Sequence, residues 1–347
     1  MSTSRRSRKK RHRVIDWTSL PKEQLLDLPI RDLRLSIEGT ELEPLVQQLH
    51  TELGQRGFTF QPHVWLSDEW FCPDGIPGFA IPFFLAHPRL KRLEQEFMLE
   101  VEGGEREQCL ALMRHETAHA VANAYRVHRR RDWRLHFGRS SQRYPTSYTP
   151  HPYSKRFVVH LENWYAQSHP DEDWAETFAV WLTPNLDWRE RYRGWPAVKK
   201  LEYVDVLMRQ LCEQRPSVRA RRQQSPVNEL RITLRTYYRN KQVRYGAKHP
   251  PFYDDDLRRL FPADAREHEA ATRWLRRHRM ELTSIIAGWT GEFRYRIDQV
   301  LRDMITHCEA LRLRVQSDTP QLKLHVVAFL TRLVMDYLHT GKFRVRV

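Results

Sequence analysis

The sequence has few cysteines, no long apolar run and no surplus of acidic residues. Its four cysteines include no Cys-x-x-Cys pair, which argues against a disulfide framework and against a cysteine zinc ribbon. The longest uncharged apolar stretch, residues 78–86, is much shorter than the roughly 20 residues that span a bilayer. No apolar segment follows the basic N-terminus, so no export signal is visible. We therefore expect a cytoplasmic protein that does not insert into a membrane.

Apolar side chains are numerous enough for a packed core. Hydrophobic residues make up 40% of the 347 residues and aromatic residues 11%, with a mean hydropathy of −0.70. This composition indicates a folded protein, long enough for two ordinary domains or one large domain.

The formal net charge of +15 is unevenly distributed along the chain. Residues 1–13 contribute +7 and residues 201–347 contribute +11, whereas residues 14–100 contribute −7. A basic surplus of this kind occurs in proteins that contact nucleic acid or anionic surfaces. A disordered, solvated tail at residues 1–13 and Arg-rich helix surfaces are the simpler explanation.

The order of the predicted elements indicates an α+β fold that is mostly helical, with a small N-terminal sheet. Apolar residues recur at helical spacing in residues 37–57, where Thr40 opens the helix, and in residues 105–127. Between them, residues 58–86 contain short aromatic-rich runs around a Pro-Gly turn, which predicts strands. Residues 138–157 lack periodicity and predict a long loop. Further helices are predicted at residues 169–182, 197–213, 227–242, 265–288, 292–315 and 320–339.

Residues 115–119 spell His-Glu-Thr-Ala-His inside a predicted helix. Residues four apart lie on one face of a helix, so His115 and His119 can bind a single Zn²⁺. Glu116 is displaced around the helix, where it can act as general base toward a water without being a metal ligand. Two histidines with a purely structural role would give the same sequence pattern, but the small Ala118 beside them leaves room for an ion. The motif therefore predicts a zinc site.

A catalytic zinc site needs a third protein ligand, whose position distinguishes the classes of zinc peptidase. The extended pattern His-Glu-x-x-His-x-x-Gly-x-x-His is absent, because Ala122 and Tyr125 occupy its diagnostic positions. No glutamate lies about twenty residues after the motif, because Asp132 is the only acidic residue between Glu116 and Glu162. The remaining candidates are His128, His136, His151, His160, Glu162, His169, Asp171, Glu172, Asp173 and Glu176.

We favour Glu172 as the third ligand. It stands four residues before Glu176 in a predicted helix, so one carboxylate can reach the metal and the other can reach the second nitrogen of a ligand histidine. Acidic residues in a first helical turn also complement the helix dipole, which is the alternative reason for their presence.

Two segments of the sequence resemble a known family. The His-Glu-Thr-Ala-His motif, followed by WYAQSHPDEDWAETFAVWL at residues 164–182, is similar to the family of putative zinc-binding metallopeptidases of bacteria. Members share a gluzincin-like His-Glu-x-x-His helix and a segment of the form His-Pro-x-Glu-Asp-[Phe/Trp]-Ala-Glu-Thr. The resemblance covers about residues 60–200. It implies zinc binding by His115, His119 and Glu172, with Glu116 as the base and Glu176 as a partner of a ligand.

The sequence departs from this family at two places. It lacks the N-terminal cysteine zinc ribbon of many members, and AVANAY follows the second histidine where a bulky aromatic pair is expected. The zinc site is compatible with both departures, whereas the second bears on substrate specificity.

These residues predict a zinc-dependent metallopeptidase, a hydrolase that cleaves peptide bonds with a zinc-activated water. The zincin-like domain would occupy residues 14–214, with a linker at 215–226 inside an Arg-rich helical region at 215–347. Two alternatives stay open: a catalytically inactive zincin-fold interaction protein, and a nucleic-acid-associated protein that uses the basic tail and the C-terminal helices. The residue that stabilises the oxyanion is left open among Tyr148, Tyr153, Tyr165 and His169.

Overall fold

The computed structural model describes residues 16–145, 148, 151, 154–245, 254–261 and 268–339. About 60% of the protein is helical, and the sheet found in the described residues has two strands. The predicted α+β, mostly helical fold is therefore confirmed. The basic tail at residues 1–13 and Tyr153 lie outside the described residues. Among the helices that are described, none is long and apolar enough to span a membrane.

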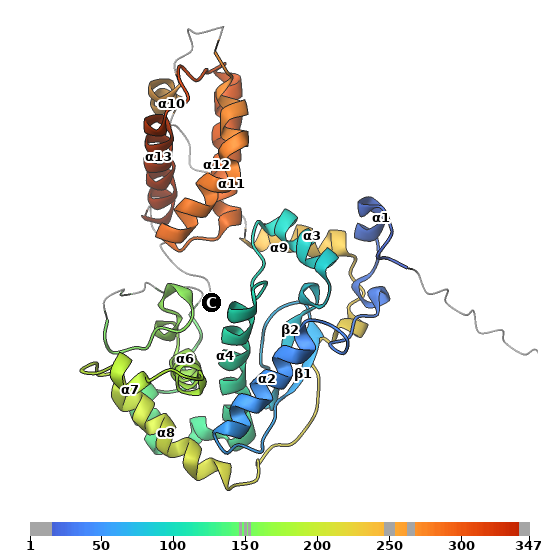
Figure 1. Ribbon diagram of the computed structural model, residues 1–347, viewed down its shortest axis with the longest axis vertical. Coiled ribbons are helices and arrows are strands. Elements are labelled where there is room, and N and C mark those ends of the chain that lie inside the picture. Colours follow the sequence, from blue (N-terminus) through green and yellow to red (C-terminus); the bar gives the residue numbers. More distant parts are fainter. Residues whose placement is uncertain are drawn as a thin grey trace, which may run out of the picture.

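The first part of the chain is built in layers around the central helix α4, Arg106–Tyr125 (Figure 1). The other helices of this part are α1 Lys22–Leu26, α2 Leu42–Gln55, α3 Pro88–Met98, α5 Arg131–Phe137, α6 Pro170–Leu182, α7 Trp188–Arg191, α8 Val198–Cys212 and α9 Leu234–Tyr245. The strands are β1 His63–Ser67 and β2 Gly78–Pro82. Strand β2 and α2 contact α4 on one side, and α6, backed by α8, contacts it on the other.

The two strands pair in parallel, with His63 opposite Gly78 and Ser67 opposite Pro82. Residues 68–77 connect them without a helix, and Phe71 in this connection forms an isolated bridge to Ala80. Strand β2 is buried along its whole length, because α4 covers it. The sequence predicted strands in this region but not their parallel pairing.

Helix α4 is buried on most of its circumference, which explains its many alanines and other small residues. It follows Gly103, whose φ of +75° suits glycine and where a Cβ would approach the ring of Trp70 to 3.0 Å. It ends at Arg126, which adopts a left-handed conformation and donates its backbone N–H to the carbonyl of Ala122. The helix thus agrees with the prediction for residues 105–127 within two residues at each end.

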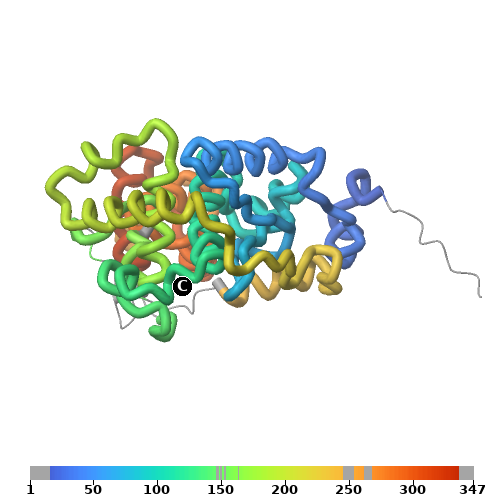
Figure 2. The backbone as a smooth tube through the Cα atoms, turned by 90° about the horizontal axis from the view of Figure 1, so that it is seen from below, coloured from blue at the N-terminus to red at the C-terminus, as the bar shows by residue number. Residues whose placement is uncertain are grey.

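The second part of the chain is a group of helices with a hydrophobic core of its own. These helices are α10 Asp254–Leu260, α11 Ala271–Thr290, α12 Arg294–Ala310 and α13 Pro320–His339. They lie together at one end of the molecule in Figure 1 and behind the rest of the chain in Figure 2. The first core extends from Trp17 to Tyr238 and so includes residues of α9. The domain boundary at residue 214 stays a prediction.

Residues 215–225, inside the segment predicted as a linker, lie against the first core; we call them the basic strap. The backbone N–H of Val218 donates to the carbonyl of Ala124 at the end of α4, at 3.0 Å. Alternate side chains of β1 point toward the strap and hydrogen-bond its carbonyls. These bonds join His63 to Arg222 at 2.7 Å, Trp65 to Gln224 at 3.0 Å and Ser67 to Ser225 at 2.6 Å. The strap is thus a fixed part of the surface.

Candidate metal centre

Two crossing helices supply the residues of the candidate metal centre. Helix α4 carries His115 and His119 one turn apart, and the first turns of α6 pack against that face. Trp174 of α6 is fully buried and donates its indole N–H to the carbonyl of Ala118 at 2.9 Å. This bond fixes the N-terminal part of α6, and with it Glu172, beside the two histidines.

The start of α6 is set by its own sequence. Pro170 occupies the first helical position, for which its fixed φ is suited. His169 caps the helix, because its Nδ1 accepts the backbone N–H of Asp171 at 3.1 Å. The acidic residues that follow are compatible with the positive end of the helix dipole. Glu172 therefore falls in the first turn of α6, as the sequence spacing predicted.

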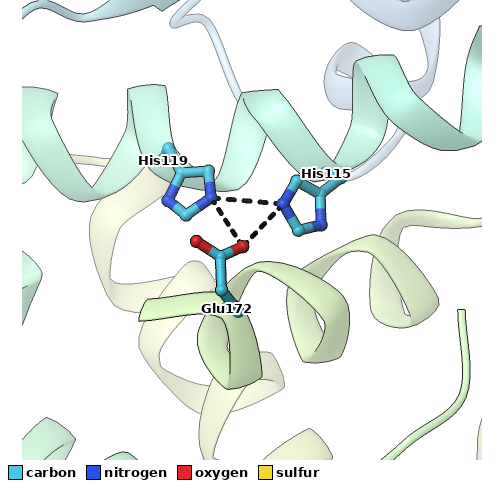
Figure 3. Close-up of side chains that lie close together, drawn as sticks. All are labelled: His115, His119 and Glu172. Carbon is cyan, nitrogen blue, oxygen red and sulfur yellow. Dashed lines mark hydrogen bonds and ion pairs between the residues drawn. The ribbon is translucent and has the colours of Figure 1, made fainter. Parts of the chain in front are cut away.

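Three donor atoms converge from these helices, as Figure 3 shows. Oε2 of Glu172 lies 3.0 Å from Nε2 of His115 and 3.4 Å from Nε2 of His119. The two Nε2 atoms are 3.2 Å apart. The side chains of His115 and Glu172 are 4% and 6% exposed, whereas that of His119 is 18% exposed. The cluster is thus closed on most sides and open toward solvent at His119.

The separations of these atoms fit a small tetrahedral cation. Zinc binds imidazole nitrogen and carboxylate oxygen at about 2.0–2.2 Å in tetrahedral geometry, which sets its ligand atoms roughly 3.3–3.5 Å apart. The observed separations of 3.0–3.4 Å are close to that range. Two histidines and one carboxylate form a donor set found in catalytic zinc sites, which keep a fourth position for water or substrate. The residues present therefore fit zinc.

The atoms of the ligand residues that face away from the cluster also have partners. Nδ1 of His115 lies 2.8 Å from Oε1 of Glu176, and Oε2 of Glu176 accepts the backbone N–H of Leu161 at 2.8 Å. Glu176 is fully buried. Oε1 of Glu172 accepts the hydroxyl hydrogen of Tyr144 at 2.9 Å. Hydrogen bonds of this kind orient the residues that bind a metal.

The charged groups of the cluster shift one another's pKa values. Burial acts to raise the pKa of Glu172, but the charges of and hydrogen bonds from His119 and His115 outweigh it and hold this pKa well below its usual value. Burial acts to lower the pKa of His115, but hydrogen bonds to Glu172 and Glu176 raise it well above its usual value. The surroundings thus favour positive charge among these atoms, which is the charge that a divalent cation supplies.

Glu116 lies next to the cluster with one atom unengaged. Its carboxylate is buried, and its Oε2 has no hydrogen-bond partner in the described part of the chain. Burial raises the pKa of Glu116, and the charges of His115 and His119 oppose this effect. A buried carboxylate oxygen without a partner is costly, so its retention beside a metal-binding cluster indicates a chemical role.

The same face of α4 also holds the turn at residues 73–76 in place. Asn123 stands one turn beyond His119, and its amide binds the turn that connects β1 to β2. Its Nδ2 donates to the carbonyls of Pro73 and Ile76 at 3.0 and 2.9 Å, and its Oδ1 accepts the backbone N–H of Gly75 at 3.1 Å. One side chain thereby fixes the position of this turn relative to the histidines.

One buried and one partly buried ion pair hold the helices of the centre against their neighbours. Arg114, next to His115, binds Glu52 of α2 through two hydrogen bonds of 2.7 Å. Asp173, next to Glu172, binds Lys200 of α8 at 2.5 Å. Removing one partner of a buried pair leaves an uncompensated charge, so these contacts restrict how far either helix can move.

Comparison with known families bears on the same helices. Residues 102–190 match the model of a family described as putative zinc-binding metallo-peptidase. The resemblance found in the sequence is confirmed over this segment, which contains both α4 and α6. Comparisons with curated proteins and with solved structures gave no significant match.

Within the segment that matches the metallo-peptidase family, the other candidate ligands do not belong to the cluster of three converging donor atoms. Among the described residues, the His, Cys, Asp and Glu side chains that could share one metal ion are those of His115, His119 and Glu172. His160 instead bonds the carbonyl of Ala111 at 3.0 Å, and His136 stacks on Tyr203.

The candidate oxyanion donors differ in how they are placed. His169 is buried and uses both ring nitrogens, since its Nε2 lies 3.1 Å from the carbonyl oxygen of Gln142. Tyr148 is buried, and the ring of Tyr165 lies 5.6 Å from that of His115. The sequence reasoning did not find Tyr144, because its bond to Glu172 spans 28 residues of chain without periodicity.

Proposed function

We propose that the protein is a zinc-dependent metallopeptidase that binds zinc through His115, His119 and Glu172. The observation that carries the proposal is the convergence of three donor atoms from two helices within 3.4 Å of one another. The match to the metallo-peptidase family supports it for the same segment. A purely structural pair of histidines would not account for the unengaged oxygen of Glu116 beside them.

In this proposal zinc, when bound, supplies a Lewis acid that polarises the scissile carbonyl and acidifies a water molecule. Glu116 would accept the proton of that water at Oε2 as the water oxygen bonds to the carbonyl carbon, and would pass it to the nitrogen of the leaving amine as the C–N bond breaks. Glu176 keeps His115 in the orientation in which its Nε2 faces the metal. The peptide substrate approaches from the side of His119, where the cluster is open.

The proposal includes a cytoplasmic location. All four cysteines of the chain are free, which suits a reducing compartment.

Substitution of Glu116 by glutamine tests the proposal. Glu116→Gln keeps the size of the side chain and removes the base, so hydrolysis of a peptide library should fall by about 100- to 10,000-fold. Metal analysis should still find one zinc per chain, because Glu116 is not a ligand. Glu107→Gln is the matched control, since Glu107 is exposed on the same helix. Unchanged cleavage by Glu116→Gln contradicts the proposed role. Stoichiometric zinc without any turnover in the wild type favours the inactive interaction protein.

The basic strap supports a second candidate function, contact with nucleic acid. Its four arginines, Arg215, Arg219, Arg221 and Arg222, are exposed, and within the described residues none of them forms an ion pair. The strap backbone is hydrogen-bonded to β1 and α4. The backbone that carries these arginine side chains is therefore fixed on the surface. A row of fixed, unpaired arginines is suited to phosphate groups.

Fluorescence anisotropy with a labelled 20-nucleotide RNA tests this second candidate. Arg221→Gln/Arg222→Gln should weaken binding and lower the magnitude of the slope of log affinity against log salt by about 1.4, because two phosphate contacts to a single strand are lost. Arg273→Gln/Arg312→Gln removes two exposed arginines from the second group of helices and should leave the slope unchanged. Undetectable binding, or equal slopes for the two double variants, contradicts the candidate.

A further inference from the structure

A short segment that follows α5 lies along the first turn of α6; we call residues 138–145 the site loop. It is held there by two contacts besides that of Tyr144. The hydroxyl of Ser140 donates to Oδ2 of Asp171 at 3.0 Å, and the ring of His169 binds the carbonyl of Gln142 at 3.1 Å. The site loop is thereby tied to the two residues that flank the start of α6.

The tautomer of His169 follows from these bonds. Its Nδ1 accepts the backbone N–H of Asp171, so the ring hydrogen of the neutral imidazole is on Nε2 and is donated to Gln142. The imidazole ring stacks on Tyr144, with ring centroids 3.7 Å apart and an interplanar angle of 18°. The ring of Tyr144 is thus positioned by a side chain that is itself fixed at both nitrogens.

Because of the hydroxyl of Tyr144, the two oxygens of Glu172 have different partners. Oε1 accepts the hydroxyl hydrogen at 2.9 Å, while Oε2 faces the two histidines at 3.0 and 3.4 Å. Glu172 therefore has a hydrogen-bond donor on one oxygen and the metal-binding cluster on the other.

We propose that Tyr144 is a positioning residue that holds Glu172 to the metal through a single oxygen. A free carboxylate can bind a cation through one or both oxygens. With Oε1 engaged by Tyr144, binding through both oxygens requires the loss of a hydrogen bond to a charged acceptor, although Tyr144 is itself 42% exposed. The metal then keeps a coordination position for water or substrate. This inference rests on the proposed zinc site and adds to it the reason why Glu172 leaves that position open.

Substitution of Tyr144 by phenylalanine tests the inference, because it removes the hydroxyl and keeps the ring that stacks on His169. Zinc affinity, measured by competition with a chromophoric chelator, should fall about 10- to 100-fold, as for other losses of a partner that orients a ligand. Replacement of zinc by Co²⁺ gives a second measurement. Four-coordinate Co²⁺ has strong visible bands, and these should weaken in Tyr144→Phe as Glu172 binds through both oxygens and the coordination number rises.

Tyr192→Phe is the matched control. The hydroxyl of Tyr192 is also hydrogen-bonded, but to the backbone of Val159 rather than to the metal-binding cluster, and Tyr192 is buried. Its zinc affinity and Co²⁺ spectrum should stay within twofold of the wild type. Thermal unfolding without metal shows that both variants are folded.

The outcomes separate this inference from the proposed function. If the wild type binds no zinc, the proposed metal centre itself is wrong. If the wild type binds zinc and Tyr144→Phe has the same affinity and the same Co²⁺ spectrum, the role of Tyr144 is overturned and the metal centre stands. Loss of hydrolysis with unchanged affinity and spectrum also overturns it, because the hydroxyl would then act on the substrate rather than on Glu172.

Discussion

Helix pairs α4–α6 and α11–α12 both bury charged side chains, but they differ in whether these side chains have hydrogen-bond and ion-pair partners. In the second pair, the fully buried Asp298 of α12 binds Arg279 of α11 and Arg302 of its own helix. In the first pair, Oε2 of the buried Glu116 has no hydrogen-bond partner in the described residues, and Oε2 of Glu172 faces the imidazoles of His115 and His119. The buried side-chain atoms without partners that are found in the described residues all belong to the first part of the chain.

This contrast distinguishes a structural ion pair from a site that needs a further group. Between α11 and α12 the buried carboxylate is paired with guanidinium groups, so no further charged group is needed there for stability. Between α4 and α6 the carboxylates and imidazoles face a common point, and their hydrogen bonds are complete only on the outer sides. Buried charged atoms that lack a hydrogen-bond or ion-pair partner are typical of sites where a ligand or a reacting group supplies that partner.

The largest difference should appear when Glu172 is removed. Loss of a partner of a ligand lowers metal affinity about 10- to 100-fold, so loss of a direct ligand in Glu172→Ala should lower zinc affinity by about 1,000-fold, or about 4 kcal/mol. Chelator competition measures this. Glu162→Ala is the control, because Glu162 is exposed and was an alternative candidate for the third ligand. Equal zinc affinity of Glu172→Ala and the wild type would move the third ligand elsewhere.

The corresponding change in the second helix pair should affect stability and leave zinc binding intact. Asp298→Ala leaves Arg279 and Arg302 without their buried partner and should lower the free energy of unfolding by about 3 kcal/mol. Denaturant unfolding measures it. Asp255→Ala breaks an exposed pair with Arg258 and should cost less than about 1 kcal/mol. A drop in zinc affinity with Asp298→Ala would show that the two parts are coupled.

Metal removal should lower the unfolding temperature of the part that contains the first hydrophobic core and leave that of the second part unchanged. Free zinc at about 100 times its Kd should stabilise the part that binds it by about 2.7 kcal/mol, which raises its Tm by about 5–10 °C for a unit of this size. The helices α10–α13 hold none of the proposed ligands, so their unfolding should not shift. Calorimetry with zinc and with excess chelator tests this. A shift of equal size in every transition contradicts the contrast.

The smallest effect is expected where the two parts meet, at Glu100. Burial and the charge of Glu102 raise the pKa of Glu100 to about 7, although Arg294 at the start of α12 opposes the shift. A carboxyl with a raised pKa in the folded state favours folding at low pH. Stability should therefore fall by on the order of 2 kcal/mol as the pH rises from about 5 to 8.

Burial also raises the pKa of Asp173 to about 7, so this residue contributes in the same pH range. Glu100→Gln should therefore remove the part of the pH dependence that Glu100 contributes, and Glu105→Gln, at an exposed position, should remove none. Urea unfolding at pH 5, 6.5 and 8 gives the comparison. A wild-type stability that rises over this range contradicts the sign of the prediction.

The helices of the metal centre could be predicted closely because their own residues set their limits. Pro170 and the residue before it start α6, and Pro184 follows its end, so the prediction of residues 169–182 differs from the structure by one residue. Helix α2 was less accurate. It begins at Leu42 rather than near residue 37, because the hydroxyl of Thr40 bonds the carbonyl of Ile37 and closes a turn before the helix.

What the sequence did not reveal depends on contacts between distant segments. The parallel pairing of β1 and β2 has no helix between the strands and thus no helical pattern to signal it. Tyr144 lies in an aperiodic segment, so nothing in its spacing relates it to Glu172. Helix α3 did carry a signal, since Leu90 and Leu93 are buried at helical spacing. Asn123 could also have been found, because it continues the i, i+4 series of the two histidines.

The place of Asn123 has a consequence for motion at the centre. The two imidazoles and the amide that grips the turn at residues 73–76 project from successive turns of one helix. A tilt or slide of α4 is therefore expected to carry the imidazoles and this turn together and to leave their spacing almost unchanged. Adjustment of the centre to a bound group is then expected from its other side, where residues 138–145 lie along the first turn of α6.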